Sequence, residues 1–367
     1  MKITRKQPLT TDGRRAVRRI WGLFLALVGL FLLSFILGRY DVPFLQVLRI
    51  LINQALTPLQ SLLNWLGSRL NFEAPSILPA QTWEKNMESI VVNVRLPRIL
   101  LSCMVGCCLA TAGASYQSVF HNPMAAPDIL GASSGACFGA ALSILLGLSK
   151  SSIVLIAFVC SLATVALVYL IASRTRSNIV ISILLAGTMV SSLCSAGTSY
   201  IKLVADPNNQ LPEITYWLMG SLANTRMSDI KFAVFPMLIG LIPLLLVRWR
   251  INLLTLGEEE ARAMGVNTTR LRILVILCAT FLTASSVAVS GMIGWVGLVI
   301  PHLCRKLLGN DNRYLIPGSM IFGAFFLLLV DNVSRNLATT EIPIGILTAF
   351  LGAPFFIYLM TRKEHSL

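Results

Sequence analysis

Side chains that could carry out chemistry are sparse in this chain of 367 residues, and they do not gather at catalytic spacings. His121, His302 and His365 stand far apart, and neither an acid nor a cysteine accompanies any of them at metal-ligand spacing. The eight cysteines all fall within apolar segments, without CxxC spacing. We therefore expect no catalytic residues, no metal site and no disulfide, and we predict that the chain is not an enzyme.

The most informative charged stretch runs from Leu253 to Val266 and reads LLTLGEEEARAMGV. Three acids, Glu258 to Glu260, open it, and acids favour the positive end of a helix dipole. Gly265 follows, and glycine favours the left-handed position just past a helix end. The pattern predicts a short helix within 253–267, outside the bilayer, where it needs a soluble partner.

The energy source of this protein is not encoded in its own sequence. There is no GxxxxGK[ST] phosphate loop, and the dipeptide Gly-Lys never occurs. Proton- or ion-coupled carriers need ionisable groups inside the membrane. The apolar segments here almost lack such groups, and Asp331 stands only at the end of one of them. A self-sufficient secondary carrier or channel is the alternative from another class, and this lack argues against it.

Composition places the elements around that charged stretch in a membrane. The chain is 55% hydrophobic and only 13% charged, against about 25% charged residues in soluble domains. Its net charge of +14 does not indicate nucleic-acid binding, because the positions of the basic residues are those expected from the topology of a membrane protein. Seven of them lie in residues 1–19, ahead of an uncharged run from Ile20 to Gly38 that we interpret as a retained first helix.

A bilayer needs about 20 apolar residues per helix, and on that basis the sequence predicts ten spans. They are placed near 20–38, 97–119, 130–148, 151–172, 179–204, 231–247, 273–292, 294–308, 314–332 and 342–361. Ten spans put both termini in the cytoplasm and place 19 of the 30 lysines and arginines there, which agrees with the positive-inside rule. The fold class is an all-α polytopic membrane protein. It has a basic segment 1–19, a single membrane domain 20–362 and a tail 363–367.

Three features of this pattern bear on packing. Gly291, Gly294 and Gly297 precede the short eighth span and predict a broken or tilted element. Small residues repeat every fourth position from Gly131 to Gly139, which favours close helix packing. The outer segment 39–95 permits either a helix along the membrane surface or a partly ordered connector, and the sequence leaves both open.

Ordered motifs across residues 90–360 resemble the FecCD-type permease family of ABC importers, which includes vitamin B12, haem and ferric-siderophore permeases. The motifs are Arg95-Leu96-Pro97-Arg98, Gly106, Gly113-Ala114, Gln117, Asn122-Pro123-Met124-Ala125-Ala126-Pro127, Leu130-Gly131, Leu185-Ala186-Gly187, Trp217-Leu218-Met219-Gly220-Ser221, GEEEARAMGV, Gly297-Leu298-Val299-Ile300-Pro301-His302, Asp331 with Arg335, Ile342-Pro343-Ile344-Gly345 and Gly352-Ala353-Pro354-Phe355-Phe356. Two departures are His121, where arginine is common, and a longer outer segment before Arg95.

The resemblance implies a type II ABC importer permease fold in a bacterial cytoplasmic membrane. Two permease chains, identical or similar, would pair around a central pathway. Two separate ATPase subunits would hold ATP and Mg and drive alternating access, and an external substrate-binding protein would dock outside. No cofactor and no nucleic acid is expected on this chain. The expected cargo is a chelated metal, foremost a ferric siderophore, with haem or cobalamin as alternatives.

The resemblance also implies roles for particular residues. The charged helix matches the family's coupling helix, so ATPase contact is expected at Gly257, Glu258, Glu259, Glu260, Ala261, Arg262 and Gly265. Arg95, Arg98 and Arg335 match positions that pair with acids of the binding protein. Two alternatives remain open there. Arg95 and Arg98 could instead anchor the second span at the interface, and Arg335 could pair with Asp331 four residues earlier.

Overall fold

The structure is a computed structural model that describes residues 11–38, 40–70, 76–77, 81, 83–175, 179–255 and 258–361. Within these residues it is helical, without strands. The helices are α1 Thr11–Ser34, α2 Phe44–Leu70, α3 Lys85–Ser89, the π-helical turn η1 Ile90–Arg95, α4 Leu96–Val119, the 3₁₀ turn η2 Pro127–Leu130, α5 Ala132–Leu145, α6 Lys150–Ser173, α7 Ile179–Val204, α8 Gln210–Leu218, α9 Met227–Leu254, α10 Glu258–Ala263, α11 Thr268–Ser290, α12 Val296–Leu308, α13 Asn312–Asn336 and α14 Ile344–Thr361. The start of the basic segment 1–19, the tail 363–367 and Gly257 lie outside the described residues.

The ten predicted spans coincide with helices of the described chain, which confirms the all-α polytopic class. They are α1, α4, α5, α6, α7, α9, α11, α12, α13 and α14. Among the described residues, seven stretches are long and apolar enough to cross a membrane, one of them the continuous Lys85–Val119. Shorter apolar helices lie at Ala132–Leu145 in α5 and Ile344–Tyr358 in α14, and α12 has 13 residues.

The predicted break before the eighth span is present. Helix α11 ends at Ser290, Gly291 has a φ of 69°, and α12 begins only at Val296. Trp295, immediately before α12, also has a positive φ of 68°, which is rare for a large side chain. Its ring lies 6.5 Å from that of Phe356 in α14, so this turn is held against another helix.

Glycines allow α4 to approach its neighbours at backbone distance. A Cβ at Gly106 would lie 2.2 Å from the carbonyl oxygen of Gly323 in α13, and a Cβ at Gly113 would lie 1.8 Å from that of Gly297 in α12. The row from Gly131 to Gly139 packs in the same way against Thr164 and Cys160 of α6. The tight bundle predicted from small residues is therefore confirmed.

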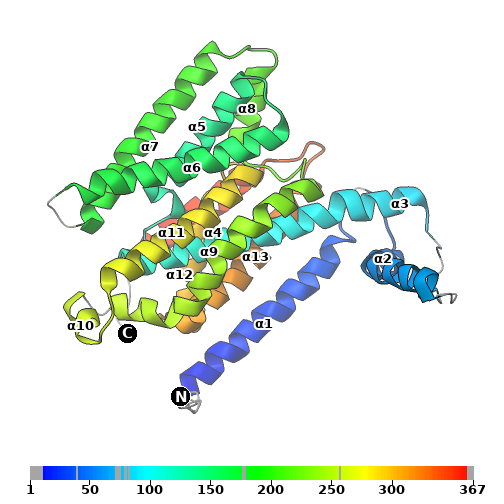
Figure 1. The fold of residues 1–367 in the computed structure, drawn as a ribbon, viewed down its shortest axis with the longest axis horizontal. Coiled ribbons are helices and arrows are strands. Elements are labelled where there is room, and N and C mark those ends of the chain that lie inside the picture. Colours follow the sequence, from blue (N-terminus) through cyan, green and yellow to red (C-terminus); the bar gives the residue numbers. More distant parts are fainter. Residues whose placement is uncertain are drawn as a thin grey trace.

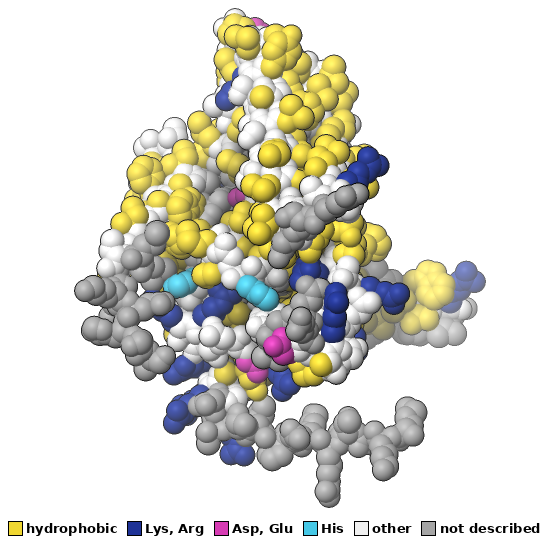
Figure 2. All heavy atoms as spheres, turned by 90° about the vertical axis from the view of Figure 1, so that its left-hand side faces the viewer, with side chains coloured by type: hydrophobic (Ala, Val, Ile, Leu, Met, Phe, Trp, Pro, Cys, Tyr) yellow, Lys and Arg dark blue, Asp and Glu magenta, His cyan; other side chains and the backbone are white. Residues whose placement is uncertain are grey.

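The two ends of the bundle differ. Helix α10 lies at one end and α3 and α8 lie at the opposite end, while α2 stands beside the bundle near the end of α1 (Figure 1). Figure 2 shows an apolar upper surface and, below it, a region in which lysine and arginine side chains gather with few acids. This division is what a bilayer imposes, because charged side chains are costly in its core.

Candidate functional site

Helix α10 joins α9 to α11 and ends as the sequence predicts. The backbone N–H of Gly265 donates to the carbonyl of Arg262 at 2.9 Å, and that of Val266 donates to the carbonyl of Ala261 at 3.1 Å. Gly265 has a φ of 77°, in the left-handed region that favours glycine. The predicted short helix and its glycine stop are therefore confirmed, with the helix starting at Glu258.

One side of α10 is seated on the bundle and the other is open. Ala261 is fully buried, and α10 packs against both α9 and α11. Glu260 and Arg262, on either side of Ala261, are exposed. The backbone of Glu258 and Glu259 forms the first turn of the helix. An open side on a firmly seated element is what contact with a partner requires, although that contact stays a prediction.

A cavity of about 450 Å³ lies beside α10. Its walls come from the end of α9, the turn Met264–Asn267 and the start of α11. Arg250 and Arg270 line it together with Trp249, and the Arg250 guanidinium lies 5.2 Å from the centre of the Trp249 ring. The surface around α10 is thus concave, basic and partly aromatic.

Asn252, near the end of α9, binds the start of α13. Its Nδ2 donates to Asp311 Oδ1 at 2.6 Å, and its Oδ1 accepts from the backbone N–H of Asn312 at 2.8 Å. The Asn312 side chain adds a bond to Asn252 Oδ1 at 2.9 Å and accepts from Ser118 Oγ of α4 at 2.9 Å. We call these four residues the inner clasp, because they join α9, α13 and α4 close to α10.

At the opposite end of α4 and α13 lies a buried cluster of charges. Arg98 Nε lies 2.8 Å from Asp331 Oδ1, and Arg98 Nη1 lies 2.8 Å from Glu341 Oε2. Arg335 Nε lies 3.3 Å from Asp331 Oδ2, and Arg335 also donates to Asn332. We call Arg98, Asp331, Arg335 and Glu341 the outer cluster. It joins α4 and α13 to the segment before α14.

Arg95 lies near this cluster but makes different contacts. Its guanidinium donates to the carbonyls of Phe35 and Tyr40, at and beyond the end of α1. These carbonyls follow the last helical turns, where the helix itself supplies no donors. A Cβ at Gly38 would lie 2.8 Å from Arg95 Nη2, so glycine makes room for this contact. Arg95 therefore fixes the exit of α1.

The three arginines expected to dock a binding protein are all buried and bound within the chain. The Arg335–Asp331 pair considered from their four-residue spacing is present. Docking through these arginines stays a prediction, and their burial argues against it. A carboxylate from outside would have to displace Asp331 or Glu341 from Arg98.

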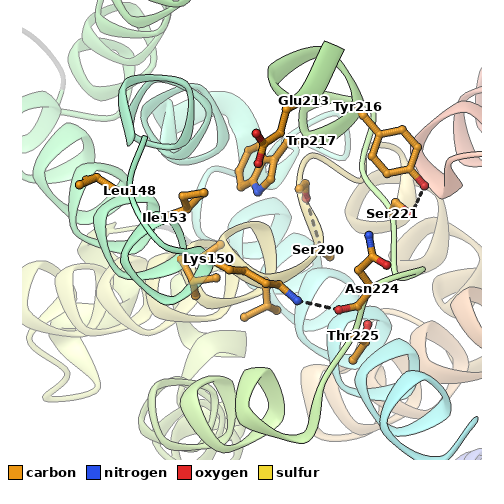
Figure 3. A pocket seen from close by; sticks show the side chains of 14 residues that line it. Leu148, Lys150, Ile153, Glu213, Tyr216, Trp217, Ser221, Asn224, Thr225 and Ser290 are labelled. Atoms are coloured by element: carbon orange, nitrogen blue, oxygen red, sulfur yellow. Dashed lines mark hydrogen bonds between the residues drawn. The ribbon is translucent and has the colours of Figure 1, made fainter. Parts of the chain in front are cut away.

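A second cavity, of about 280 Å³, opens at the same end of the bundle as α8 (Figure 3). Lys150, at the start of α6, donates to the carbonyl of Asn224 at 2.6 Å and pairs with Asp229 at 2.9 Å. Glu213 and Trp217 of α8 cover the opposite side of the cavity in Figure 3.

Sequence reasoning missed Glu341 and the inner clasp. Glu341 stands outside the predicted spans, and nothing local links it to Arg98, 243 positions away. Asn252 and Asn312 carried a signal, since amides beside apolar segments need hydrogen-bond partners. Arg305 of α12 similarly donates to Gln117 of α4. Among the described residues, no group of three or more His, Cys, Asp or Glu side chains is placed to hold a metal ion.

Comparison with known proteins defines the class of this bundle. The family model described as the FecCD transport family matches residues 25–362, so the chain belongs to the FecCD family. Members of this family are permease subunits of ABC importers, which are transport components rather than catalysts. The chain is accordingly a multi-pass membrane permease. Membership in an importer family implies ATPase and substrate-binding partners.

Relatives named for different substrates match this chain. The molybdate import system permease protein MolB of Haemophilus influenzae is 39% identical over 347 residues, covering 95% of this chain and 96% of that protein. A probable iron chelatin transport system permease protein of Helicobacter pylori is 39% identical over 283 residues, covering 76% and 84%. Permeases for haem and cobalamin match as well. A solved structure described as an inward-facing conformation of a metal-chelate type ABC transporter has a TM-score of 0.79 at 37% identity, covering 94% of this chain and 99% of that one.

Proposed function

We propose that this permease moves a chelated metal, foremost a ferric siderophore, from an external binding protein into the cytoplasm by ATP-driven alternating access. The observation that carries the proposal is α10, a helix seated through Ala261 at the charged end of the bundle, with Glu260 and Arg262 exposed. Family membership supplies the partner class, since ABC importers hydrolyse ATP on separate subunits.

The proposed assembly contains two permease chains, identical or similar, two ATPase subunits and one binding protein. In it α10 faces the cytoplasm together with both chain termini, and ATPase contact falls on Gly257 to Arg262 and Gly265. The basic surface around the 450 Å³ cavity supports this orientation, because basic residues gather on the cytoplasmic side. The binding protein docks at the opposite end, beside α3 and α8.

Iron chelates are favoured by the family resemblance and by the iron chelatin relative. Molybdate is a second candidate, favoured by one specific observation: the MolB match extends over 95% of this chain, against 76% for the iron chelatin relative. Both cargoes contain a metal. Haem and cobalamin remain alternatives within the same machine.

Uptake by a deletion strain tests the proposal. The strain would be given labelled ferric siderophore, molybdate, haem and cobalamin in separate assays, and the gene would be restored either intact or as the control variant Gly22→Ala. We expect the deletion strain to lose ferric-siderophore uptake. The intact gene should restore it, and so should the Gly22→Ala gene, because a Cβ at Gly22 meets nothing within 4 Å. Loss of molybdate uptake alone would select the second candidate. Normal uptake of all four cargoes would refute the import function for these substrates.

A further inference from the structure

One side of helix α2 is apolar and faces away from the rest of the protein. Leu45, Leu48, Ile52, Ala55, Leu59 and Leu62 follow one another at alternating spacings of three and four, and all are exposed. This spacing places them on one line along a helix. We call these six residues the outer stripe. Leu45 is 57% exposed and Leu62 is 51% exposed, so the stripe is open at both ends.

The protein contacts α2 elsewhere. Val47 and Ile50 are buried in a cluster with Phe35, directly after the end of α1, and this cluster anchors the first half of the helix. On the polar side, Gln60 is only 8% exposed, because its carbonyl accepts from the backbone N–H of Ile77 at 2.8 Å and its amide donates to Asn64 at 2.9 Å. The chain thus covers Val47, Ile50 and Gln60 and leaves the outer stripe uncovered.

The position of α2 connects this stripe to the lipid-facing surface. Helix α2 follows α1 along the chain and lies beside the bundle (Figure 1). Helix α1 exposes Trp21 and Leu25, by 60% and 67%, on the side away from α12 and α13. A helix that spans the bilayer with this open side faces acyl chains, and α2 begins close to its end. The outer stripe therefore continues a surface that already meets lipid.

The charges of α2 fit a lipid surface as well. Residues 44–70 contain Arg49 and Arg69 and no acid. The Arg69 guanidinium lies 5.5 Å from the centre of the Trp65 ring, and Trp65 is an exposed aromatic at the far end of the helix. Tryptophan and arginine are enriched where a helix meets headgroups, and basic residues attract anionic lipids.

We propose that α2 is a membrane-surface helix that lies along the outer headgroup region with the outer stripe turned into the acyl chains. Its partner is lipid, and it steadies the outer ends of α1 and η1, to which it is joined through Val47 and Ile50. This assignment goes beyond transport, because it concerns how the permease is held in its membrane. It decides between the surface helix and the connector that the sequence left open.

Spin-label accessibility tests the assignment without any transport partner. The amino acid p-acetylphenylalanine replaces Ile52 or Leu59 in the stripe, or Gln54 or Ser61 two positions further on, and carries a nitroxide that leaves the eight cysteines unlabelled. The permease is reconstituted in vesicles of phosphatidylcholine and phosphatidylglycerol. We expect oxygen to collide with the labels at 52 and 59 more often than a water-soluble nickel chelate does. At 54 and 61 we expect the opposite order, since residues two apart face opposite sides of a helix.

Each other outcome overturns the assignment. Nickel-chelate collision at 52 and 59 as frequent as at 54 and 61 would put the stripe in water. Low collision with both reagents would mean that protein covers the stripe. Spin–spin broadening that vanishes on dilution with unlabelled permease would identify a second copy as the partner.

A second pair of variants separates membrane contact from misfolding. Leu59→Glu should shift the label at 52 towards nickel-chelate accessibility, because a carboxylate is costly among acyl chains. Ser61→Glu, on the polar side, should leave the label at 52 unchanged. Equal effects of the two variants, with both proteins eluting as wild type does, would contradict the proposal. None of these measurements depends on ATP or cargo, so their failure would leave the import function untouched.

Discussion

Asp331 shows how one residue organises the end of the bundle opposite α10. It is fully buried and lies between Arg98 of α4 and Arg335 of its own helix. A buried carboxylate is tolerated when its charge is compensated, and two guanidinium groups provide that here. Sequence reasoning noted its position at the end of a span. The structure adds that it is the centre of a cluster that ties three segments together.

Removing this charge should destabilise the permease more than removing its exposed neighbour. We expect Asp331→Asn to lower the free energy of unfolding by about 3–5 kcal/mol, because Arg98 and Arg335 would lose their shared counter-charge in a buried site. Glu341→Gln should cost under about 1 kcal/mol, since partly exposed ion pairs contribute little. The side chain of Glu341 is 33% exposed. Denaturant unfolding in micelles measures both, and equal losses would contradict the ranking.

At the scale of helices, backbone contact through glycine sets the packing of α4. Gly106 meets α13 and Gly113 meets α12, each at a distance that leaves no room for a side chain. The same helix is buried over most of its length. It therefore serves as the central column against which α12 and α13 are placed.

A methyl group at this contact should be harmful. Gly113→Ala would place a Cβ 1.8 Å from the Gly297 carbonyl oxygen, so the helices must separate. We expect a loss of about 1–3 kcal/mol, typical of overpacking. Gly29→Ala in α1, where nothing lies within 4 Å, is the matched control and should be neutral. Thermal unfolding of the two variants gives the comparison, and a neutral Gly113→Ala would refute the close contact.

Helix α10 is the element on which we propose that coupling depends. Changing Glu258, Glu259 and Glu260 together to lysine should uncouple ATP hydrolysis from transport while the bundle stays folded, because these residues lie on a six-residue helix outside the spans. Transport per ATP hydrolysed by the reconstituted complex is the measurement. Lys306→Glu in α12, remote from α10 in sequence, is a single charge reversal of the opposite sign and controls for charge reversal as such. Unchanged transport in the triple variant would refute the coupling role.

At the scale of the molecule, α4 and α13 are tied together at both ends. The inner clasp joins them to α9, six residues before α10, and the outer cluster joins them to the segment before α14. Between these ends the two helices touch at Gly106 and Gly323. We expect a pair held in this way to move as one body, which would give a displacement of α10 a direct route to the opposite end.

Breaking the inner clasp should therefore affect coupling more than folding. We expect Asn252→Leu to lower transport per ATP hydrolysed and Asn252→Gln, which keeps an amide donor for Asp311 and an amide oxygen for the Asn312 backbone N–H, to retain more of it. The stability loss should be a few kcal/mol at most, since each hydrogen bond contributes about 1 kcal/mol. Reconstituted transport and unfolding together separate the two effects. A proportional loss of both hydrolysis and transport would indicate a merely structural role.

The amino-acid sequence was enough to predict the apolar helices of the bundle, the short helix α10 with its glycine stop, and the lack of a phosphate loop. These follow from local composition and periodicity, because a bilayer accepts only chain segments that satisfy their own backbone hydrogen bonds. The burial of Arg95, Arg98 and Arg335, the pairing of Glu341 with Arg98 and the binding of Asn252 to Asn312 became visible in the folded chain alone. The same holds for the helix α2 and its open side. Such partners lie far apart along the chain, and packing alone brings them within hydrogen-bonding distance.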